Sequence, residues 1–155
     1  TRYKDWSRGL GDVYKRQDHQ VRYEELVERM KPYLQEMKVQ EGEYLFKQRD
    51  TNRNLFFIMR GTVNLIGENR QGTTTRIRTL GPWTVTGEVG SFSGYHAPYS
   101  AMVEKAGLIY RLSEEHRKQM ESENPELAAE FHQMIIIMIG NQLMKASRAM
   151  VESLN

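Results

Sequence analysis

One stretch of the chain, residues 86–101, carries residue types that could bind an anionic small molecule. It reads TGEVGSFSGYHAPYSA. The glycine at position 87 could let the chain bend and expose backbone N–H groups at the start of a short helix, which favours an anion. The carboxylate of Glu88 could accept hydrogen bonds from sugar hydroxyls. Glycine-rich connections between strands are common, so this pattern alone does not define a site.

The residues that catalysis would need are scattered. The histidines, His19, His96, His116 and His132, form no cluster with metal-ligand spacing, and the chain has no cysteine. Neither GxGxxG nor GxxxxGK[ST] occurs. Ser91 and Ser93 lie near His96, but short spacing does not make a catalytic dyad. The sequence therefore predicts a binding or regulatory protein rather than an enzyme, and no metal site.

The middle of the chain has the period of β-structure. Short apolar runs alternate with turn signals, a pattern typical of an all-β sandwich or barrel. The eight predicted strands are Lys38–Gln40, Tyr44–Lys47, Asn54–Arg60, Gly61–Gly67, Thr73–Leu80, Val85–Thr86, Tyr99–Glu104 and Leu108–Leu112. The run from Leu55 to Met59 is continuously apolar, which predicts a strand buried on both faces. Gly61 separates two strand-like runs and predicts a turn.

Helices are expected on both sides of the β-region. Residues 18–37 predict an amphipathic helix that Pro32 should end or kink. After the strands, Ser113 can cap one helix, and Asn124 followed by Pro125 can start a second that runs to about Val151. This last helix has an apolar stripe: Leu127, Phe131, Ile135, Ile139, Leu143, Ala146, Met150 and Leu154.

Residues 134–139 of the last helix are apolar all round and must be covered on several sides. Packing on the β-region would cover them. A second copy of the chain, pairing as a homodimer through this helix, or upstream protein of the same chain would also do so. The pattern leaves these alternatives open.

The stretch from Glu41 to Leu112 resembles the cyclic-nucleotide-binding domain family. Residues 41–50 resemble the family's opening strand and turn, and residues 55–63 its buried strand and glycine turn. Gly87-Glu88 with Pro98-Tyr99-Ser100-Ala101 is similar to its phosphate-binding cassette, so we call residues 86–101 the cassette. The resemblance implies a mainly β fold with flanking helices: an eight-stranded antiparallel jelly-roll barrel, one N-terminal helix and two C-terminal helices.

The resemblance also implies a candidate pocket for cyclic AMP or cyclic GMP. Its residues would be Gly87, Glu88, Val89, Pro98, Tyr99, Ser100 and Ala101. The family's glutamate binds the ribose 2′-hydroxyl, and Glu88 matches it. Gly87 matches the glycine whose backbone approaches the ligand, and Ser100 a hydroxyl near the phosphate.

Two departures from the family pattern weaken this pocket. Tyr99 stands where the family has the arginine that pairs with the cyclic phosphate. Loss of that charge-assisted contact should cost about 1.5–3 kcal/mol. Arg49 occupies a position that is usually glycine. We therefore expect a degenerate pocket with weak cyclic-nucleotide binding, a different ligand or none.

Residues 77–81, 87–90, 109–113 and 123–132 are similar to one subgroup, the cytoplasmic C-terminal domains of bacterial sulfate-permease-type anion transporters. The implied partners are an anti-sigma-antagonist-type domain and a membrane domain upstream, and the implied location is the cytoplasmic side of the inner membrane. The alternatives are the sensor half of a catabolite-activator-like transcription regulator and a non-binding scaffold. A metal-dependent enzyme on a jelly roll would need clustered histidines.

Residues 7–17, SRGLGDVYKRQ, look like the in-frame translation of a sequencing-library adapter, and residues 1–6 fit the same source. We expect residues 1–17 to be non-native or disordered, with the native chain continuing upstream. A natural basic arm is the alternative. A single domain would then occupy 18–155, with its β-region at 38–112 and its last helices at 113–155.

The net charge of the native chain depends on whether residues 1–17 belong to it. Residues 1–17 hold five of the 22 Lys and Arg residues and two of the 20 Asp and Glu residues. The remainder has 17 basic and 18 acidic residues, a net charge of −1. A basic face for nucleic acid is therefore not expected. No apolar run reaches the length of about 20 residues that a membrane span needs.

Overall fold

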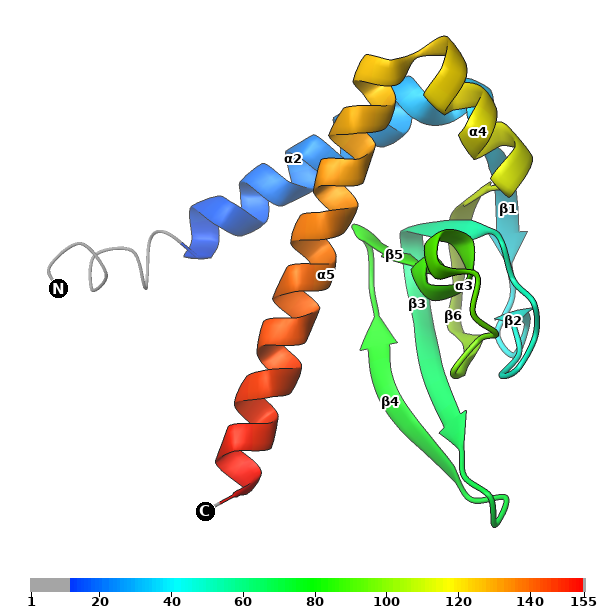
Figure 1. Cartoon of the computed structure of the whole chain (residues 1–155), viewed down its shortest axis with the longest axis vertical. Coiled ribbons are helices and arrows are strands. Elements are labelled where there is room, and N and C mark those ends of the chain that lie inside the picture. Colours follow the sequence, from blue (N-terminus) through cyan, green and yellow to red (C-terminus); the bar gives the residue numbers. More distant parts are fainter. Residues whose placement is uncertain (1–11, 155) are drawn as a thin grey trace, which may run out of the picture.

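An antiparallel sheet flanked by helices makes up the chain in the computed structural model, which describes residues 12–154 (Figure 1). Helix α2 (Asp12–Met30) precedes the sheet, and α4 (Glu114–Glu123) and α5 (Pro125–Ser153) follow it. The strands are β1 (Gln35–Val39), β2 (Tyr44–Phe46), β3 (Leu55–Glu68), β4 (Thr74–Leu80), β5 (Thr84–Thr86) and β6 (Ser100–Leu112), with helix α3 (Glu88–Ser93) between the last two. The predicted mainly β fold with flanking helices is confirmed.

The prediction of a closed eight-stranded barrel is wrong. Six strands form one open sheet in the order β1-β6-β3-β4, with β2 paired to β6 and β5 paired to β3. The difference arises because two pairs of predicted strands are each one long strand. Asn54–Arg60 and Gly61–Gly67 fall on β3, and the two runs between Tyr99 and Leu112 fall on β6.

A glycine pair explains why these strands continue where a turn was predicted. Gly61 lies inside β3 with φ of 86°, and the register with β6 shifts between Ile58 and Val63. A Cβ at Gly61 would lie 2.5 Å from the carbonyl oxygen of Lys105, and one at Gly107 would lie 2.0 Å from that of Arg60. Glycine therefore permits bulges that bend both strands without ending them.

Strand β3 separates two hydrophobic cores, which confirms the predicted burial on both faces for residues 55–58, whereas Met59 is only partly buried. Leu55 and Phe57 point into a helix-side core with Tyr23 and Phe131. Phe56 and Ile58 point into a sheet-side core with other residues of the strands. The hydroxyl of Tyr23 donates to the carbonyl oxygens of Ile58 and Thr84, both at 3.0 Å, and so attaches α2 to the sheet.

The helix ends follow the capping residues. Ser113 Oγ accepts from the backbone N–H of His116 at 3.1 Å, and Asn124 Oδ1 accepts from that of Leu127 at 3.3 Å. Helix α2 ends at Met30 rather than at residue 37, because Pro32 lies in the 3-10 turn Lys31–Tyr33 that follows it. Residues 35–37 belong to β1 instead.

Helix α2 also begins inside the segment 1–17 whose codons we ascribe to an adapter. Residues 12–17 are helical, whereas residues 1–11 lie outside the described residues. The backbone conformation does not bear on the origin of the codons, so that assignment stays a prediction for the coding DNA.

Arg49 adopts φ of 74° on an exposed turn, a conformation that favours glycine. We predict that Arg49→Gly raises the free energy of unfolding by about 0.5–1 kcal/mol. Glycine removes the strain of the left-handed conformation, which stabilises the folded state by about 1–2 kcal/mol. This gain exceeds the loss of about 0.4–1 kcal/mol that comes from the greater conformational freedom of glycine in the unfolded chain. Urea denaturation would measure the change. Gly94 has the same φ of 74°, and no atom lies within 4 Å of a Cβ built on it. Gly94→Ala should therefore lower stability, and equal signs for the two variants would contradict the argument.

Candidate functional site

The cassette packs directly on the loop before β3. Helix α3 starts after Gly87, whose φ is 95°. A Cβ on Gly87 would lie 2.2 Å from the carbonyl oxygen of Asn54, and a Cβ on Gly90 would lie 2.0 Å from that of Asn52. Both positions therefore require glycine, because any side chain would displace the loop.

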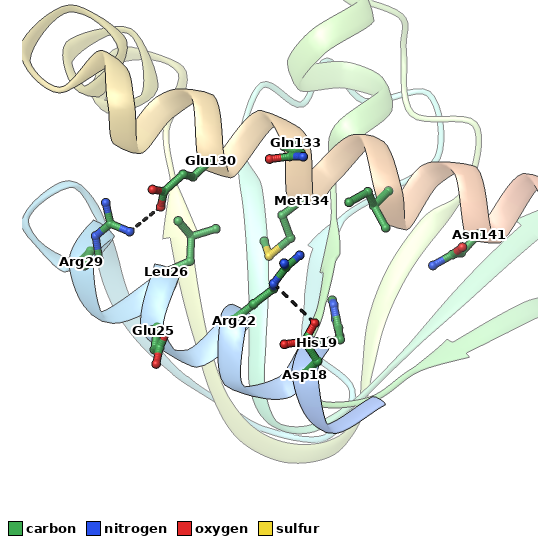
Figure 2. Close-up of a pocket in the computed structure, with 11 residues that line it drawn as sticks. Asp18, His19, Arg22, Glu25, Leu26, Arg29, Glu130, Gln133, Met134 and Asn141 are labelled. Carbon is green, nitrogen blue, oxygen red and sulfur yellow. Dashed lines mark hydrogen bonds and ion pairs between the residues drawn. The ribbon is translucent and has the colours of Figure 1, made fainter. Parts of the chain in front are cut away.

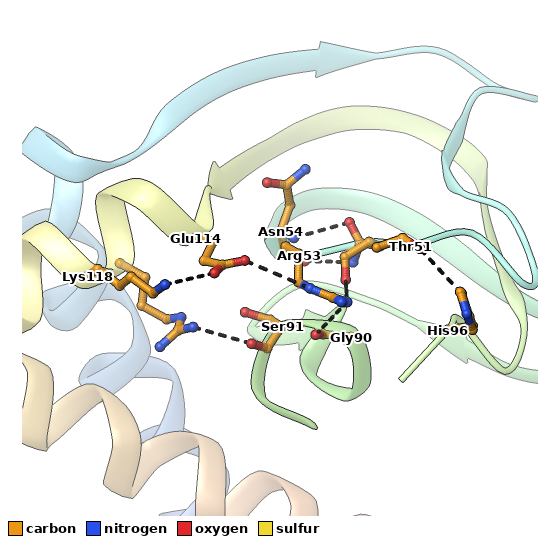
Figure 3. A network of polar contacts seen from close by, with 10 residues as sticks. Thr51, Arg53, Asn54, Gly90, Ser91, His96, Glu114 and Lys118 are labelled. Atoms are coloured by element: carbon orange, nitrogen blue, oxygen red, sulfur yellow. Dashed lines mark hydrogen bonds and ion pairs between the residues drawn. The ribbon is translucent and has the colours of Figure 1, made fainter. Parts of the chain in front are cut away.

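Polar contacts hold this loop against α3 (Figure 3). The Asn52 side chain donates to the carbonyl oxygen of Asn54 at 2.9 Å and accepts from its backbone N–H at 3.2 Å. Arg53 donates to the carbonyl oxygen of Gly90 at 3.2 Å. Its Nε also lies 3.9 Å from Glu114 Oε2 on α4, so one side chain connects the loop, the cassette and the last helices.

The structure brings the two halves of the predicted site together. We call residues 87–89, at the start of α3, the bend, and residues 98–99, just before β6, the edge. Gly87 and Val89 of the bend and Pro98 and Tyr99 of the edge line one cavity. The Glu88 carboxyl group lies beside the Tyr99 hydroxyl, and each changes the pKa of the other. The bend and the edge therefore face each other, as the family resemblance implies.

Two of the predicted residues are directed elsewhere. Ser100 Oγ accepts a hydrogen bond from the backbone N–H of Gln48 at 2.8 Å, so its hydroxyl is engaged by the preceding turn. Ala101 is fully buried in the sheet-side core. Both are structural in this conformation, whereas Gly87, Glu88, Val89, Pro98 and Tyr99 border the cavity or its polar contact.

Burial dominates the electrostatics of the site. It raises the pKa of Glu88, an effect partly opposed by a backbone hydrogen bond, the charge of Arg78 and the Tyr99 hydroxyl. Burial and the neighbouring Glu88 raise the pKa of Tyr99 to about 12. Among the described residues, Glu88 Oε2, Thr86 Oγ1 and Ser91 Oγ are buried without a hydrogen-bond partner. The cassette thus holds oxygens that could accept hydrogen bonds from a ligand.

Arg78 is a site residue that the sequence argument missed. It acts electrostatically on both Glu88 and Tyr99 although it lies on β4, pairing opposite Leu65 of β3. Residues two apart on a strand share a face, so Arg78 points the same way as Leu80, which is buried in the sheet-side core. Its Nε is buried and has no partner among the described residues. It therefore supplies a cation near the cassette from a different strand.

The cavity between bend and edge is too small for a nucleotide in this conformation. Its volume is about 10 Å³, close to what one water needs and far below the ~300–1,000 Å³ of ligand pockets. The Tyr99 ring helps to fill it and lies 6.3 Å from the Phe46 ring, between centroids. Tyr99 is thus one of the side chains that bound this small cavity.

The cassette is connected to both C-terminal helices. Arg117 of α4 donates to the carbonyl oxygen of Ser91 at 3.3 Å and lies 5.0 Å from the ring centroid of Phe92. Phe92 in turn lies 6.2 Å from Phe131 and 5.9 Å from His132 of α5. A movement of α3 would therefore change contacts on α4 and α5.

A larger cavity of about 590 Å³ lies away from the cassette, between α2 and α5 (Figure 2). Its charged residues are mostly paired with each other: Arg22 lies 3.5 Å from Asp18, and Arg29 pairs with Glu130. Within residues 12–154, no three His, Asp or Glu side chains gather as metal ligands would, and no helix is long and apolar enough to span a membrane.

The pH dependence of stability should reveal the buried Glu88. Because its pKa is raised above 4.5, the stability that it contributes is present below pH 4.5 and is lost as pH rises through the raised pKa. Glu88→Gln should therefore gain stability relative to the wild type between pH 4 and pH 7, measured by urea denaturation. Glu114 is the control, because hydrogen bonding to Lys118 lowers its pKa. Glu114→Gln should show the opposite trend, and parallel trends would contradict the assignment.

A sheet with a ligand-type cassette between strands, flanked by helices that contact the cassette, defines a class of regulatory binding domain. The family model for the cyclic nucleotide-binding domain matches residues 36–124, more than half of the chain. The chain therefore belongs to the cyclic nucleotide-binding domain family.

Solved structures share the fold. A cyclic nucleotide-binding domain from Methylobacillus flagellatus KT superposes with a TM-score of 0.76 at 18% identity, covering 83% of this chain and 72% of that one. The catabolite activator protein of Thermus thermophilus gives a TM-score of 0.68 at 21% identity, covering 81% and 57%. Neuropathy target esterase sws of Drosophila willistoni is 25% identical over 123 residues, 75% of this chain but 8% of that protein. The chain thus spans less than a tenth of that curated relative.

Proposed function

We propose that this domain is a regulatory module with a degenerate cassette, which binds cyclic AMP or cyclic GMP weakly or not at all. The observation that carries the proposal is the position of Tyr99. Its side chain replaces the expected cation, lies against Glu88 and borders a cavity of only about 10 Å³. Because the Tyr99 ring borders so small a cavity, a nucleotide is a poor fit. We therefore expect the module to act through contacts with other protein segments.

Ligand-induced stabilisation tests this proposal. A ligand at a hundred times its dissociation constant adds about 2.7 kcal/mol to the free energy of unfolding. We expect no thermal shift of the wild-type chain with micromolar cyclic AMP or cyclic GMP. A saturable shift at micromolar ligand would overturn the proposal and make Arg78 the first candidate for the phosphate-binding cation.

We propose further that the domain is the C-terminal cytoplasmic part of a sulfate-permease-type anion transporter. An anti-sigma-antagonist-type domain and a membrane domain would precede it in the same polypeptide and hold it at the inner membrane. The support is the resemblance of residues 77–81, 87–90, 109–113 and 123–132 to that subgroup. Sequencing the native locus tests it: membrane spans upstream are expected, and a helix-turn-helix domain downstream would overturn it.

A second candidate is the sensor half of a catabolite-activator-like transcription regulator. The specific observation is that the Thermus thermophilus catabolite activator protein shares the fold over 81% of this chain. The net charge of −1 over residues 18–155 gives this segment little attraction for DNA by itself. A scaffold that binds no ligand and only holds neighbouring domains is the third candidate, and the thermal-shift result would not separate it from the first.

We propose that the domain is not an enzyme. Three of the four histidines contact separate partners: His19 lies 2.9 Å from the carbonyl oxygen of Trp83, His96 lies 3.3 Å from Thr51, and His132 lies 3.0 Å from Glu121. These contacts are spread over different elements. Only His96 contacts a hydroxyl, that of Thr51 on the exposed surface, and among the described residues no carboxylate bonds to His96 as the orienting group of a catalytic triad would. Hydrolysis of generic ester or phosphodiester substrates by the purified chain would contradict this proposal.

A further inference from the structure

Strand β4 forms an open edge of the sheet. It pairs with β3 along one side, and among the described residues no hydrogen bond outside that ladder involves its backbone. The first four residues of β4, Thr74 to Ile77, are exposed. Figure 1 shows the hairpin of β3 and β4 projecting beyond the other strands. The N–H and C=O groups on the outer side of β4 are therefore available to pair with an added strand.

The open edge carries charge of one sign. Residues 69–80 contain no acidic residue but three arginines: Arg70, Arg76 and Arg78. In the described part of the chain, no carboxylate lies within ion-pair distance of any of them. The strand at the other end of the strand order, β1, carries Glu36 and Lys38, so its charges cancel. The edge at β4 is therefore basic, whereas the edge at β1 is neutral.

A bulge determines where the side chains of β4 point. Arg78 pairs opposite Leu65 of β3. Arg76 pairs opposite the next residue, Ile66, so Ile77 is an extra residue between the two arginines. Because neighbouring residues of β3 point to opposite faces, the two arginines do so as well. Ile77 is 54% exposed, so the edge presents an apolar side chain beside the outward-facing Arg76.

These features exclude several possible partners of the edge. Arginines and a bulge on an edge strand hinder pairing with most other strands. A second copy of β4 would place arginine beside arginine, and like charges on paired strands are destabilising. Nucleic acid is a weaker fit, because Arg78 acts on the cassette and only Arg70 and Arg76 remain for phosphates. An acidic strand is favoured by the same charges that repel these alternatives.

We infer that β4 binds an extended acidic segment of a partner protein, which joins the sheet as a further strand. Its carboxylates would face Arg70 and Arg76, and one of its apolar side chains would cover Ile77. Main-chain hydrogen bonds to the edge would supply affinity, and the side chains would supply specificity. Arg78 of the same strand would place the segment beside the cassette. The inference does not depend on whether the cassette binds a nucleotide.

A short synthetic peptide tests the added strand. The probe is a capped peptide as long as β4 that alternates glutamate with valine, and amide NMR of the 155-residue chain follows its binding. We expect saturable shifts at residues 74–80 and slower hydrogen exchange of the β4 amides that β3 does not bond. A matched peptide with lysine in place of glutamate should not bind. No shift in β4, or equal binding of both peptides, would overturn the inference.

N-methylated peptides separate strand addition from attraction between charges. Alternate N–H groups of an added strand face β4, and the others face solvent. Two versions of the glutamate peptide are N-methylated at one or the other alternate set, and only one of them should lose binding. Equal binding of the two versions would show that charge alone holds the peptide, against the inference. Displacement of the peptide by single-stranded DNA at equal affinity would also overturn it, because the arginines would then serve phosphates.

Two charge-reversed variants locate the binding site. Arg76→Glu should weaken binding of the glutamate peptide at least about tenfold, because it replaces an attractive cross-strand pair by a repulsive one. The same variant should bind the lysine peptide, which the wild type does not. Lys38→Glu makes an identical charge change at an exposed position of β1 and should leave both affinities unchanged. Equal losses in the two variants would show that net charge, and not β4, is recognised, and the inference would fail. Circular dichroism confirms folding, since both positions are exposed.

Discussion

Replacing Tyr99 with arginine is expected to create cyclic-nucleotide binding in a domain that otherwise shows little or none. The substitution restores a charge-assisted contact worth about 1.5–3 kcal/mol, which corresponds to roughly ten- to hundredfold in affinity. It also removes the phenol ring that lies beside Glu88 and Phe46. Isothermal titration with cyclic AMP and cyclic GMP, supported by thermal shifts, would measure the gain.

Two further variants show whether the gain uses the predicted pocket. Glu88→Gln in the Tyr99→Arg background should lower affinity again, because a carboxylate accepts stronger hydrogen bonds from ribose than an amide does. Arg78→Gln in the same background reports on the second cation. If Tyr99→Arg folds but binds nothing at millimolar ligand, the cavity is closed by more than one residue, and the restored contact is not the limiting one.

The sequence predicted most residues of the site but not the small size of its cavity. The pairing of the bend at Gly87 with the edge at Tyr99 follows from the resemblance, and the structure brings them together. The small size of the cavity depends on side-chain packing between Tyr99 and Phe46, which no local pattern specifies. Arg78 could have been found, because alternation along residues 74–80 places it on the same face as Leu80.

The fold was predictable wherever local physics decides. Ser113 and Asn124 cap the helices that they predict, Pro125 begins the second of them, and residues 55–58 are buried on both faces. The strand count was wrong because a glycine inside a strand and a glycine in a turn give the same local signal. Only the close approach of Gly61 to Lys105 and of Gly107 to Arg60, both contacts across the sheet, distinguishes them.

The cassette and the C-terminal helices pack against each other through a shared aromatic cluster. Phe131 of α5 lies 5.8 Å from Phe57 of β3 and 6.2 Å from Phe92 of α3. Arg117 adds a polar contact from α4 to the same cassette helix. Phe131 and Phe92 therefore provide one apolar connection between the cassette and α5, beside the polar connection through Arg117.

Phe131→Ala should therefore be among the most destabilising single substitutions. Phe131 is fully buried, and truncating such a ring costs about 3–5 kcal/mol through lost burial and the cavity that remains. Phe131→Leu retains most of the volume and should cost clearly less. Gln133→Ala, at an exposed position of the same helix, should stay within about 0.5 kcal/mol of the wild type. Urea denaturation would rank the three. A cost below about 1 kcal/mol for Phe131→Ala would show that α5 does not rely on this cluster, and the cassette would then be uncoupled from the helix.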